Sequence, residues 1–235
     1  MSRDATLIIP QCNQLDLTRR CCQTLQRTQT VWPEILIVDD GSDVDLLSDA
    51  LPELDACGDL LQLPHRGVTA AWNSGCEAAR TRWVILLNND VWSLGPWCEQ
   101  LLAPLRAGVA TLTGVEWRDE RQLPAALAGR WERWLSGWCL AIERSRLLDL
   151  GGFDPDLALY FSDTDLQIRL RRMASPVDPL LAVSGLPIRH AGHQTAHRLR
   201  DVREQWQRDR RTFHRKWRHL GSMDTHASQR LAQSE

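Results

Sequence analysis

The chain has almost no lysine: Lys216 is the only one, and every other basic residue is arginine. Schiff-base chemistry needs a lysine amine, so it is excluded everywhere else in the chain. No stretch approaches 18 consecutive apolar residues, and the opening MSRDATLIIPQCNQ lacks the layout of a signal peptide. These absences predict a cytoplasmic protein, either free or in peripheral contact with the inner face of the membrane.

Paired cysteines and a large net charge are also lacking. The seven cysteines are scattered and form no CxxC pair, which argues against a zinc site or a disulfide framework and favours buried, reduced thiols. The net charge is −2 and the pI is about 6.4, so no overall positive field attracts nucleic acid, and we expect no nucleic-acid partner. With 235 residues, 43 % of them hydrophobic, the chain can bury a sizeable core.

The first half of the chain alternates apolar strands with helical patterns. Strands are predicted at 6–10, 34–38, 59–63 and 83–87, and helices at 15–27, 43–51 and 68–80. The strands are too apolar to have a face in water, so they predict an α/β fold with a parallel sheet covered by helices on both sides. The ligand crevice of such a sheet lies beyond the carboxyl ends of its strands.

The second half is less regular. Strands are predicted within 108–117, 133–144 and 180–190, and helices over 144–149, from about 162 onward, and over 198–220. The last of these helices carries nine Arg/Lys against three Asp/Glu, and its Trp206, Phe213 and Trp217 share one face. That face favours either packing on the domain or a basic, aromatic-edged surface that rests on anionic lipid.

Three polar clusters follow predicted strands, at Pro10–Asn13, Asp39–Ser42 and Asn88–Asp90. On an extended backbone the side chains of Asn88 and Asp90 leave on the same side, which suits a carboxylate on a divalent cation and an amide on a ribose or phosphate. Turn residues at the end of a strand would explain the same letters. Asp39 and Asp40 could accept hydrogen bonds from a nucleobase and a ribose, or cap the next helix.

Two further segments carry candidate chemistry. In RGVTAAWNSG, residues 66–75, small side chains at a helix start would let a diphosphate approach, although tight helix–sheet packing explains them as well. In the helix from about 162, Asp165 can pair with Arg169, which leaves Asp163 as a candidate general base. His190 becomes a candidate ligand only if it shares a crevice with Asp90.

The order of these segments resembles the family 2 glycosyltransferases. The segments are IIPxxN, VDDGSxxD, RGxxxAxNxG, LLNND, GGFDPxLxxYFxDTDLxxR and HxGxxT, within residues 5 to about 217. The resemblance is closest to the bacterial rhamnosyltransferase-like branch, which builds surface polysaccharides. It implies a GT-A fold, which is Rossmann-like, with a mostly parallel central sheet flanked by helices and a C-terminal helix.

The resemblance also implies how the chain is divided. One GT-A domain would span residues 1–220. Its nucleotide-binding half would cover about 1–110, its acceptor-binding half about 111–197, and a basic helix 198–220. A frayed tail would follow at 221–235.

The resemblance implies inverting transfer of a sugar from a UDP-, dTDP- or GDP-linked donor to a hydroxyl of a carbohydrate or lipid-linked acceptor, with Mn²⁺ or Mg²⁺ as cofactor. It assigns Asp90 and His190 to the metal and Asp163 to the catalytic base. The residues that it places at the nucleotide-sugar are Pro10, Gln11, Cys12, Asn13, Asp39, Asp40, Arg66, Gly67, Asn73, Asn88 and Asn89.

Three positions depart from the family pattern. Cys12 replaces a frequent aromatic that stacks on the base, and Asn88 replaces the first aspartate of the DXD motif. Ser162 stands where an acidic pair usually begins with glutamate, so Asp163 lacks the neighbour that would strengthen it as a base.

These departures leave a second reading open, a non-catalytic module that binds a nucleotide-sugar or docks a partner. A nucleotidyltransferase is a weaker rival, because such enzymes need a Gly-rich loop with Arg or Lys after the first strand, where this chain has PQCNQLD. The aromatic rings of Trp131, Trp134 and Trp138 could either stack on an acceptor sugar or fill a core between the two halves.

Overall fold

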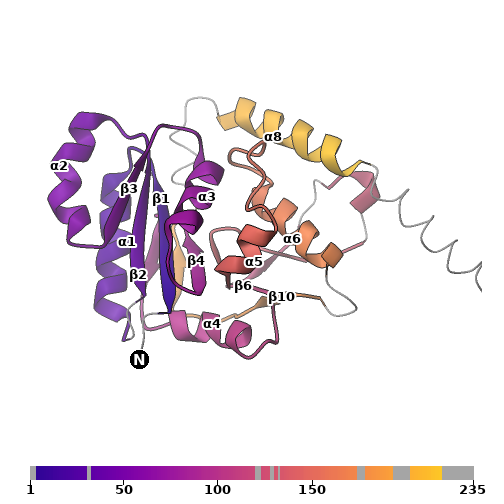
Figure 1. Cartoon of the computed structure of the whole chain (residues 1–235), viewed down its shortest axis with the longest axis horizontal. Coiled ribbons are helices and arrows are strands. Elements are labelled where there is room, and N and C mark those ends of the chain that lie inside the picture. The colour runs from indigo at the N-terminus through magenta and orange to yellow at the C-terminus, as the bar shows by residue number, and fades with distance from the viewer. Residues whose placement is uncertain are drawn as a thin grey trace, which may run out of the picture.

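A seven-stranded sheet forms the centre of the computed structural model (Figure 1). The structure describes residues 4–30, 33–119, 123–127, 130–131, 133–173, 178–192 and 202–218. The strand order is β10-β6-β9-β4-β1-β2-β3. Their bounds are β1 Ala5–Gln11, β2 Glu34–Asp40, β3 Asp59–Leu63, β4 Trp83–Leu87, β6 Leu112–Gly114, β9 Cys139–Glu143 and β10 Leu180–Ala182. Among these, β9 alone runs against its neighbours β4 and β6, so the sheet is mostly parallel, as predicted.

Helices cover both faces of the sheet. The helices are α1 Leu15–Thr28, α2 Val44–Asp55, α3 Val68–Ala78, α4 Cys98–Arg106, α5 Arg144–Asp149 and α6 Ser162–Met173. On β1, Leu7 and Ile9 pack in one core with α1, α2 and α4, whereas Ile8 packs in a second core with α3, α5 and α6. Successive strand residues face opposite sides of the sheet, so an apolar strand with no polar alternation needs both layers, as expected.

The predicted strands 108–117, 133–144 and 180–190 are each divided in two, which corrects the sequence reading. The short strands outside the main sheet are β5 Val91–Ser93, β7 Trp117–Arg118, β8 Trp134–Leu135 and β11 Ile188–His190, and a single 3-10 turn, η1, covers Ala125–Leu127 among the described residues. The predicted strand 180–190 is thus divided into β10 and β11. In the last case Gly185, with φ +79°, turns the chain between β10 and β11. Strand β11 then leaves the main sheet and pairs antiparallel with β5.

Helix α3 lies unusually close to the sheet at Gly75. A Cβ atom at this position would lie 2.5 Å from Cγ2 of Ile8 and 3.1 Å from Cγ2 of Val38. Real side chains do not approach so closely, so a glycine is needed for this contact. The packing explanation for the small residues of 66–75 therefore holds at Gly75.

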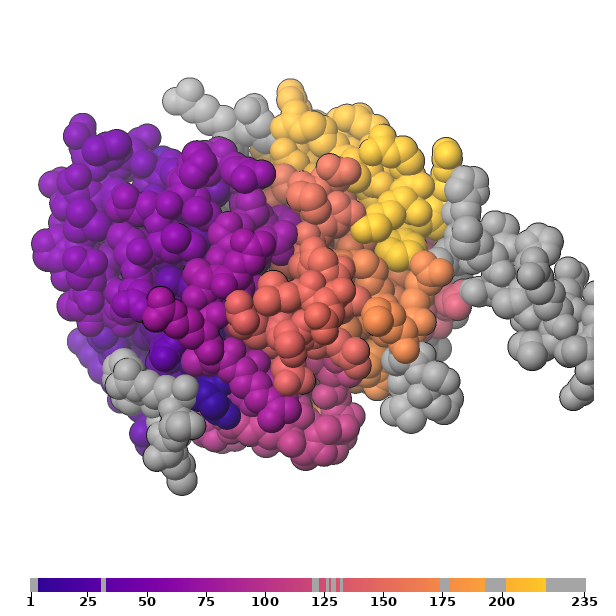
Figure 2. Space-filling model, in the orientation of Figure 1, coloured from indigo at the N-terminus to yellow at the C-terminus, as the bar shows by residue number. Residues whose placement is uncertain are grey.

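The C-terminal helix α8, Val202–Trp217, lies against the segments of the second half, above α6 in Figure 1. Phe213 and Trp217 are buried in a third core with Phe161 and Ile168, so the aromatic face packs inward. Figure 2 shows α8 in contact with these segments along its length. The rest of the predicted 198–220 helix and the predicted 221–235 tail lie outside the described residues. Within the described residues, no helix is both long enough and apolar enough to cross a membrane.

Candidate functional site

Two adjoining cavities open beyond the carboxyl ends of β1, β2 and β4. The central cavity, of about 470 Å³, is bordered by Asn88, Asp90, Asp163 and His190, among others. The side cavity, of about 460 Å³, is lined by Pro10, Gln11, Cys12, Asp40, His65, Arg66, Gly67, Val68, Ala158, Leu159, Val202, Gln205 and Arg208. Pro10, Val68 and Leu159 line both cavities, so the two spaces meet there. Both volumes are in the usual range for small-molecule sites.

Asp90 and His190 lie together in the central cavity, 100 residues apart in sequence. Strand β5 begins directly after Asp90, and its antiparallel pairing with β11 sets His190 opposite Val91. The backbone carbonyl of Asp90 also accepts a hydrogen bond from the amide of Ala191 at 2.9 Å. As a result, Oδ1 of Asp90 lies 3.0 Å from Nε2 of His190.

This pair fits two ligands of one octahedral cation. Ligand atoms about 2.1 Å from such a cation lie about 3.0 Å apart along each edge of the octahedron, which matches the Asp90–His190 distance. Across the part of the chain that the structure describes, no group of three or more His, Cys, Asp or Glu side chains could hold a metal. A cation here would therefore keep most of its positions for ligand oxygens and water, as Mg²⁺ commonly does with substrate phosphates.

Of the two residues before Asp90, Asn88 borders the cavity and Asn89 contacts helix α1. Asn88 borders the central cavity, and its backbone amide donates to the carbonyl of Trp138 at 2.9 Å. Asn89 is buried, and its Nδ2 donates to Oγ1 of Thr18 on helix α1. The chain turns at 89–90 rather than staying extended, yet Asn88 and Asp90 both face the cavity.

Trp138 forms a wall beside the candidate ligand His190. The two rings stack with centroids 4.9 Å apart and an interplanar angle of 10°. Nε1 of Trp138 donates to Oε1 of Glu116 at 2.9 Å, which holds the indole in place. Of the three tryptophans considered from the sequence, Trp138 lines the cavity, whereas Trp134 is fully buried in the third core and Trp131 packs against it.

Asp163 lies across the central cavity, at the start of α6, and is held by a residue that sequence reasoning missed. Nη2 of Arg118 lies 2.8 Å from Oδ2 of Asp163, and the amide of Thr164 donates to Oδ1 at 2.8 Å. A Cβ atom on Gly137 would lie 2.5 Å from the same Oδ2, so only glycine fits there. The carboxylate is thus fixed on the cavity wall with 21 % of its side chain exposed.

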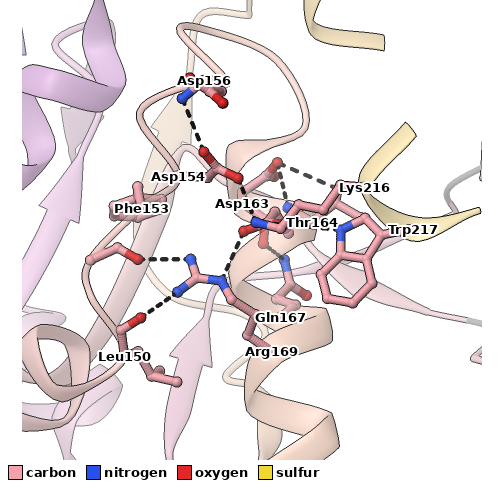
Figure 3. Close-up of polar contacts among 12 residues, drawn as sticks. Leu150, Phe153, Asp154, Asp156, Asp163, Thr164, Gln167, Arg169, Lys216 and Trp217 are labelled. Atoms are coloured by element: carbon pink, nitrogen blue, oxygen red, sulfur yellow. Dashed lines mark hydrogen bonds and ion pairs between the residues drawn. The ribbon is translucent and has the colours of Figure 1, made fainter. Parts of the chain in front are cut away.

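Asp165 is structural, as predicted. Its side chain is fully buried, and Nε of Arg169 donates to it at 2.8 Å. Figure 3 shows Arg169 reaching from this contact to the loop before α6, where its guanidinium donates to the carbonyls of Leu150 and Gly152. Arg169 thereby ties α6 to this loop, and the carboxylate of Asp165 holds the Arg169 side chain in place.

Tyr160, the only tyrosine, also lines the central cavity. Burial, and then the charge of Asp209, raises the pKa of its phenol. The group therefore stays neutral near pH 7, where it can donate a hydrogen bond but does not serve as a base.

The predicted nucleotide residues Asp39 and Asp40 both bond to the protein itself. The Asp39 carboxylate accepts from Gln11 Nε2 and from Ser42, and Asp39 lines neither cavity. Asp40 lines the side cavity, where its oxygens accept from the amides of Arg66 at 2.8 Å and Gly67 at 2.9 Å. The two carboxylates therefore shape the loops around the side cavity.

Cys12, in place of the expected aromatic, lies in the side cavity 3.8 Å from Nδ1 of His65. Burial, followed by the charges of Asp40 and Asp39, raises the pKa of its thiol to about 11. The thiol is thus protonated at neutral pH and presents an apolar, polarisable surface with only a weak S–H donor.

Asn13 and Asn73 support the site from outside the cavities. Asn13, with φ +54°, accepts from the amide of Asp43 at 2.7 Å and so joins the loops after β1 and β2. The amide of Asn73 bonds to both the N–H and the carbonyl of Phe153, at 2.8 and 2.9 Å. The resemblance assigns Asn73 to the segment beside the nucleotide; in the structure Asn73 lies on α3, lines neither cavity, and contacts the loop that precedes α6.

Helix α8 supplies residues that the sequence did not indicate. Gln205 and Arg208 line the side cavity, and Trp206 lines the central cavity. The only sequence signal was the helical pattern itself, which shows a shared face but not the neighbour that it meets.

The model of the family described as "Glycosyl transferase family 2" matches residues 6–168, more than half of the chain. EpsH of Bacillus subtilis strain 168, whose name assigns it to the glycosyltransferases, is 30 % identical over 100 residues. That match covers 41 % of this chain but only 29 % of EpsH.

Solved structures share the fold. Glucosyl-3-phosphoglycerate synthase from Mycobacterium tuberculosis, in complex with Mn²⁺ and UDP, is 20 % identical, with a TM-score of 0.64 over 89 % of this chain and 77 % of that one. The mannosyltransferase PcManGT from Pyrobaculum calidifontis, in complex with GDP-Man and Mn²⁺, is 17 % identical, with a TM-score of 0.58 over 78 % of this chain. This chain covers 55 % of PcManGT. For Staphylococcus aureus TarS 1-349 the identity is 13 % and the TM-score 0.60, over 86 % of this chain and 65 % of that one.

The predicted GT-A fold is therefore confirmed, with its mostly parallel sheet flanked by helices. On the family match over residues 6–168, this chain belongs to glycosyl transferase family 2.

Proposed function

We propose that this chain is an inverting, metal-dependent glycosyltransferase that moves a sugar from a nucleotide diphosphate-sugar to an acceptor hydroxyl. The observation that carries the proposal is the 3.0 Å approach of Asp90 to His190 in the cavity that also holds Asp163. A candidate cation site and a candidate base thus face one space. The order of the sequence motifs supports the rhamnosyltransferase-like branch and a role in surface polysaccharide or glycoconjugate synthesis.

The donor would span both cavities. Asp90 and His190 would hold Mn²⁺ or Mg²⁺, which would act as a Lewis acid for the charge developing on the departing diphosphate. The nucleoside, from a UDP-, dTDP- or GDP-linked sugar, would extend through the junction at Pro10 into the side cavity. The family match covers residues 6–168, so it includes Asp163, the candidate base.

Asp163 would take the proton of the acceptor hydroxyl as that oxygen attacks the anomeric carbon. One displacement with one base inverts the anomeric configuration, and no separate nucleophile is then needed. Arg118 and the amide of Thr164 orient the carboxylate. Each carboxylate oxygen has two lone pairs, so these contacts leave room to accept the substrate proton.

The acceptor would be a carbohydrate, free or lipid-linked, that enters the central cavity beside the donor sugar. Trp138 and Trp206 present aromatic rings there, and Tyr160 adds a neutral hydroxyl. Sugars commonly rest their C–H faces on such rings, with polar groups at the edges. We expect stacking on Trp138 rather than on Trp134, because Trp134 is fully buried.

A binding panel tests the metal assignment. Affinities for UDP, dTDP and GDP would be measured with and without Mn²⁺ for the wild type, Asp90→Ala and His190→Ala, with Asp49→Ala, an exposed aspartate on α2, as the matched control. We expect one diphosphate to bind in a metal-dependent way, Asp90→Ala to abolish that dependence, and His190→Ala to weaken it by roughly tens-fold. Unchanged Mn²⁺-dependent affinity in Asp90→Ala would remove the central claim.

Turnover separates the enzyme from a non-catalytic module. The wild type would be incubated with the sugar derivative of whichever diphosphate binds, and release of the diphosphate would be followed with Asp163→Asn as the comparison. We expect slow hydrolysis even without acceptor, and none above background would favour the binding module.

We also propose a peripheral membrane contact through the exposed arginines of α8. Because Phe213 and Trp217 pack inward, the contact would rest on exposed arginines rather than on the aromatic face, among them Arg211 and Arg215 of α8 and Arg218 directly after it. Each basic residue near an anionic surface contributes about 1 kcal/mol at low salt. Sedimentation with liposomes, with and without anionic lipid and at two ionic strengths, tests this; binding that ignores lipid charge, or no binding, would leave α8 with only its packing role.

A further inference from the structure

Helix α8 forms one wall of the side cavity, opposite the loops of the parallel strands. Val202, Gln205 and Arg208, one helical turn apart, line the cavity on this side. The same cavity is lined by Asp40, the last residue of β2, and by Arg66, in the loop after β3. The side cavity is therefore built jointly by the two ends of the chain.

A buried carboxylate fixes the first half of α8 to this wall. Asp209 is 1 % exposed, and it accepts hydrogen bonds from the backbone amides of Ala158, Leu159 and Tyr160 at 3.3, 3.0 and 2.8 Å. Leu159 lines both cavities, so the loop that Asp209 holds is the partition between them. Hydrogen bonds to a charged acceptor are among the stronger ones in proteins.

The second half of α8 is held by the buried Asp165. Nζ of Lys216 lies 2.7 Å from Oδ1 of Asp165, and Nε1 of Trp217 donates to the same oxygen at 2.9 Å. Lys216 also pairs with Asp154 on the loop before α6. Figure 3 shows Lys216 and Trp217 reaching from α8 toward α6 and this loop. The only lysine of the chain thus serves to fix the helix.

The strained residue of the central cavity rests on the same helix. Phe161 has φ +63°, a conformation that is an outlier for a bulky side chain. Its ring stacks on Phe213 of α8 with centroids 5.0 Å apart, and it also contacts Trp206. Since strain persists only where the surroundings enforce it, α8 is an integral part of the site.

Within α8, a short relay of hydrogen bonds orients the arginine at the side cavity. Nε2 of Gln205 donates to Oδ1 of Asp209 at 2.7 Å, and Nη2 of Arg208 donates to Oε1 of Gln205 at 3.1 Å. The other terminal nitrogen, Nη1, lies 3.6 Å from Glu204, and about half of the Arg208 side chain is exposed. A guanidinium has five N–H donors, so several remain for a ligand in the cavity.

We propose that Arg208 contacts the nucleoside of the donor and that Gln205 positions the guanidinium of Arg208. This deepens, and rests on, the proposed function. Arg208 lines only the side cavity, whereas the candidate metal ligands Asp90 and His190 line only the central one. With the diphosphate at the metal, the group that reaches Arg208 is the nucleoside, whose base carbonyls and ribose oxygens accept hydrogen bonds from a guanidinium.

The experiment compares Arg208→Ala with Arg211→Ala, an exposed arginine of the same helix that lines neither cavity. Isothermal titration with Mn²⁺ would use the diphosphate that the wild type binds best among UDP, dTDP and GDP, and then the matching nucleoside, which carries no phosphate. We expect Arg208→Ala to weaken both ligands by about tenfold, as loss of a charged hydrogen bond does, and Arg211→Ala to leave both unchanged. Gln205→Leu, which removes the orienting contact but not the charge, should give a smaller loss for both.

The outcomes are distinct. Unchanged affinity in Arg208→Ala, beside a wild type that binds, would overturn this contact while leaving the proposed function intact. A loss confined to the diphosphate would also overturn it, because the arginine would then contact phosphate rather than the nucleoside. A wild type that binds none of the three diphosphates would overturn the proposed function, and the Arg208 contact with it.

Discussion

Asp209→Ala should destabilise the protein more than any single surface change, because it leaves three backbone N–H donors without their acceptor at once. The wild-type carboxylate is buried and accepts from the amides of residues 158–160 and from Nε2 of Gln205. Alanine supplies no acceptor for any of these groups. A hydrogen bond to a charged group contributes about 1.5–3 kcal/mol when lost.

The losses do not simply add, because the loop is only half-buried and water can reach part of it. Removing one partner of a buried charged contact usually costs about 3–5 kcal/mol, and we expect a value in that range. Asp209→Asn keeps one acceptor oxygen and should cost roughly half as much, since Oδ2 alone accepts from both Leu159 and Tyr160. A domain is typically stable by about 5–15 kcal/mol, so the alanine variant should fold at 25 °C but unfold at clearly lower urea.

Urea unfolding followed by far-UV circular dichroism measures this, with Asp49→Ala as the surface control. The urea midpoint should fall least for Asp49→Ala, further for Asp209→Asn and furthest for Asp209→Ala, while the dependence of the unfolding free energy on urea stays similar. Because the loop held by Asp209 separates the two cavities, nucleotide affinity should fall in the same order. A cost below about 1 kcal/mol for Asp209→Ala would refute the anchoring role, and intact nucleotide affinity in a destabilised variant would show that the loop keeps its place without α8.

Three further predictions concern the site and its supports. Asp163→Asn should keep nucleotide and metal affinity but lower kcat by about 10²–10⁴-fold; transfer at the wild-type rate would reassign the base. For Asp154, burial acts to raise the pKa, but the hydrogen bond and charge of Lys216, with smaller contributions, outweigh it and lower the pKa. The carboxylate therefore stabilises the fold above about pH 4 and loses this contribution as the pH falls below it. The urea midpoint should thus fall less steeply between about pH 5 and 3 in Lys216→Met than in the wild type. An equally steep fall in both proteins would show that the ion pair is not formed. The Cys12 thiol, with its pKa raised to about 11 by burial and nearby carboxylates, should react slowly with iodoacetamide at pH 7.5 and about tenfold faster per pH unit up to pH 10; rapid labelling at pH 7.5, read by mass spectrometry, would contradict this.

The sequence could predict the sheet, and the edge of it at which Asp90 lies, for a physical reason. Apolar runs without alternation require two covered faces, which determines a parallel α/β arrangement, and polar residues at strand ends then meet at one edge. The family resemblance added His190, whose place depends on β11 pairing with β5. That pairing was not visible in the sequence, where β10 and β11 read as one strand.

What the sequence could not show were contacts made by irregular segments. Arg118 and Glu116 lie in and beside a two-residue strand, β7, where no periodicity marks a face, yet they hold Asp163 and Trp138. Helix α8 displayed its aromatic face clearly, but a helical pattern does not reveal the neighbour. The sequence therefore left packing and membrane contact both open for this helix, and it gave no sign that Arg208 borders the side cavity.

Asp40 combines contacts to the protein with a place on the wall of the side cavity. It accepts from the amides of Arg66 and Gly67, and Nδ1 of His65 lies 3.0 Å from Oδ2. A carboxylate offers about four lone-pair positions, so these three donors leave about one for a donor group of a nucleotide. Asp39 is occupied in a similar way by Gln11 and Ser42 but lines neither cavity. Of these two predicted nucleotide contacts, we therefore expect Asp40 to make the direct one, with Asp39 holding the loop after β2 through Ser42.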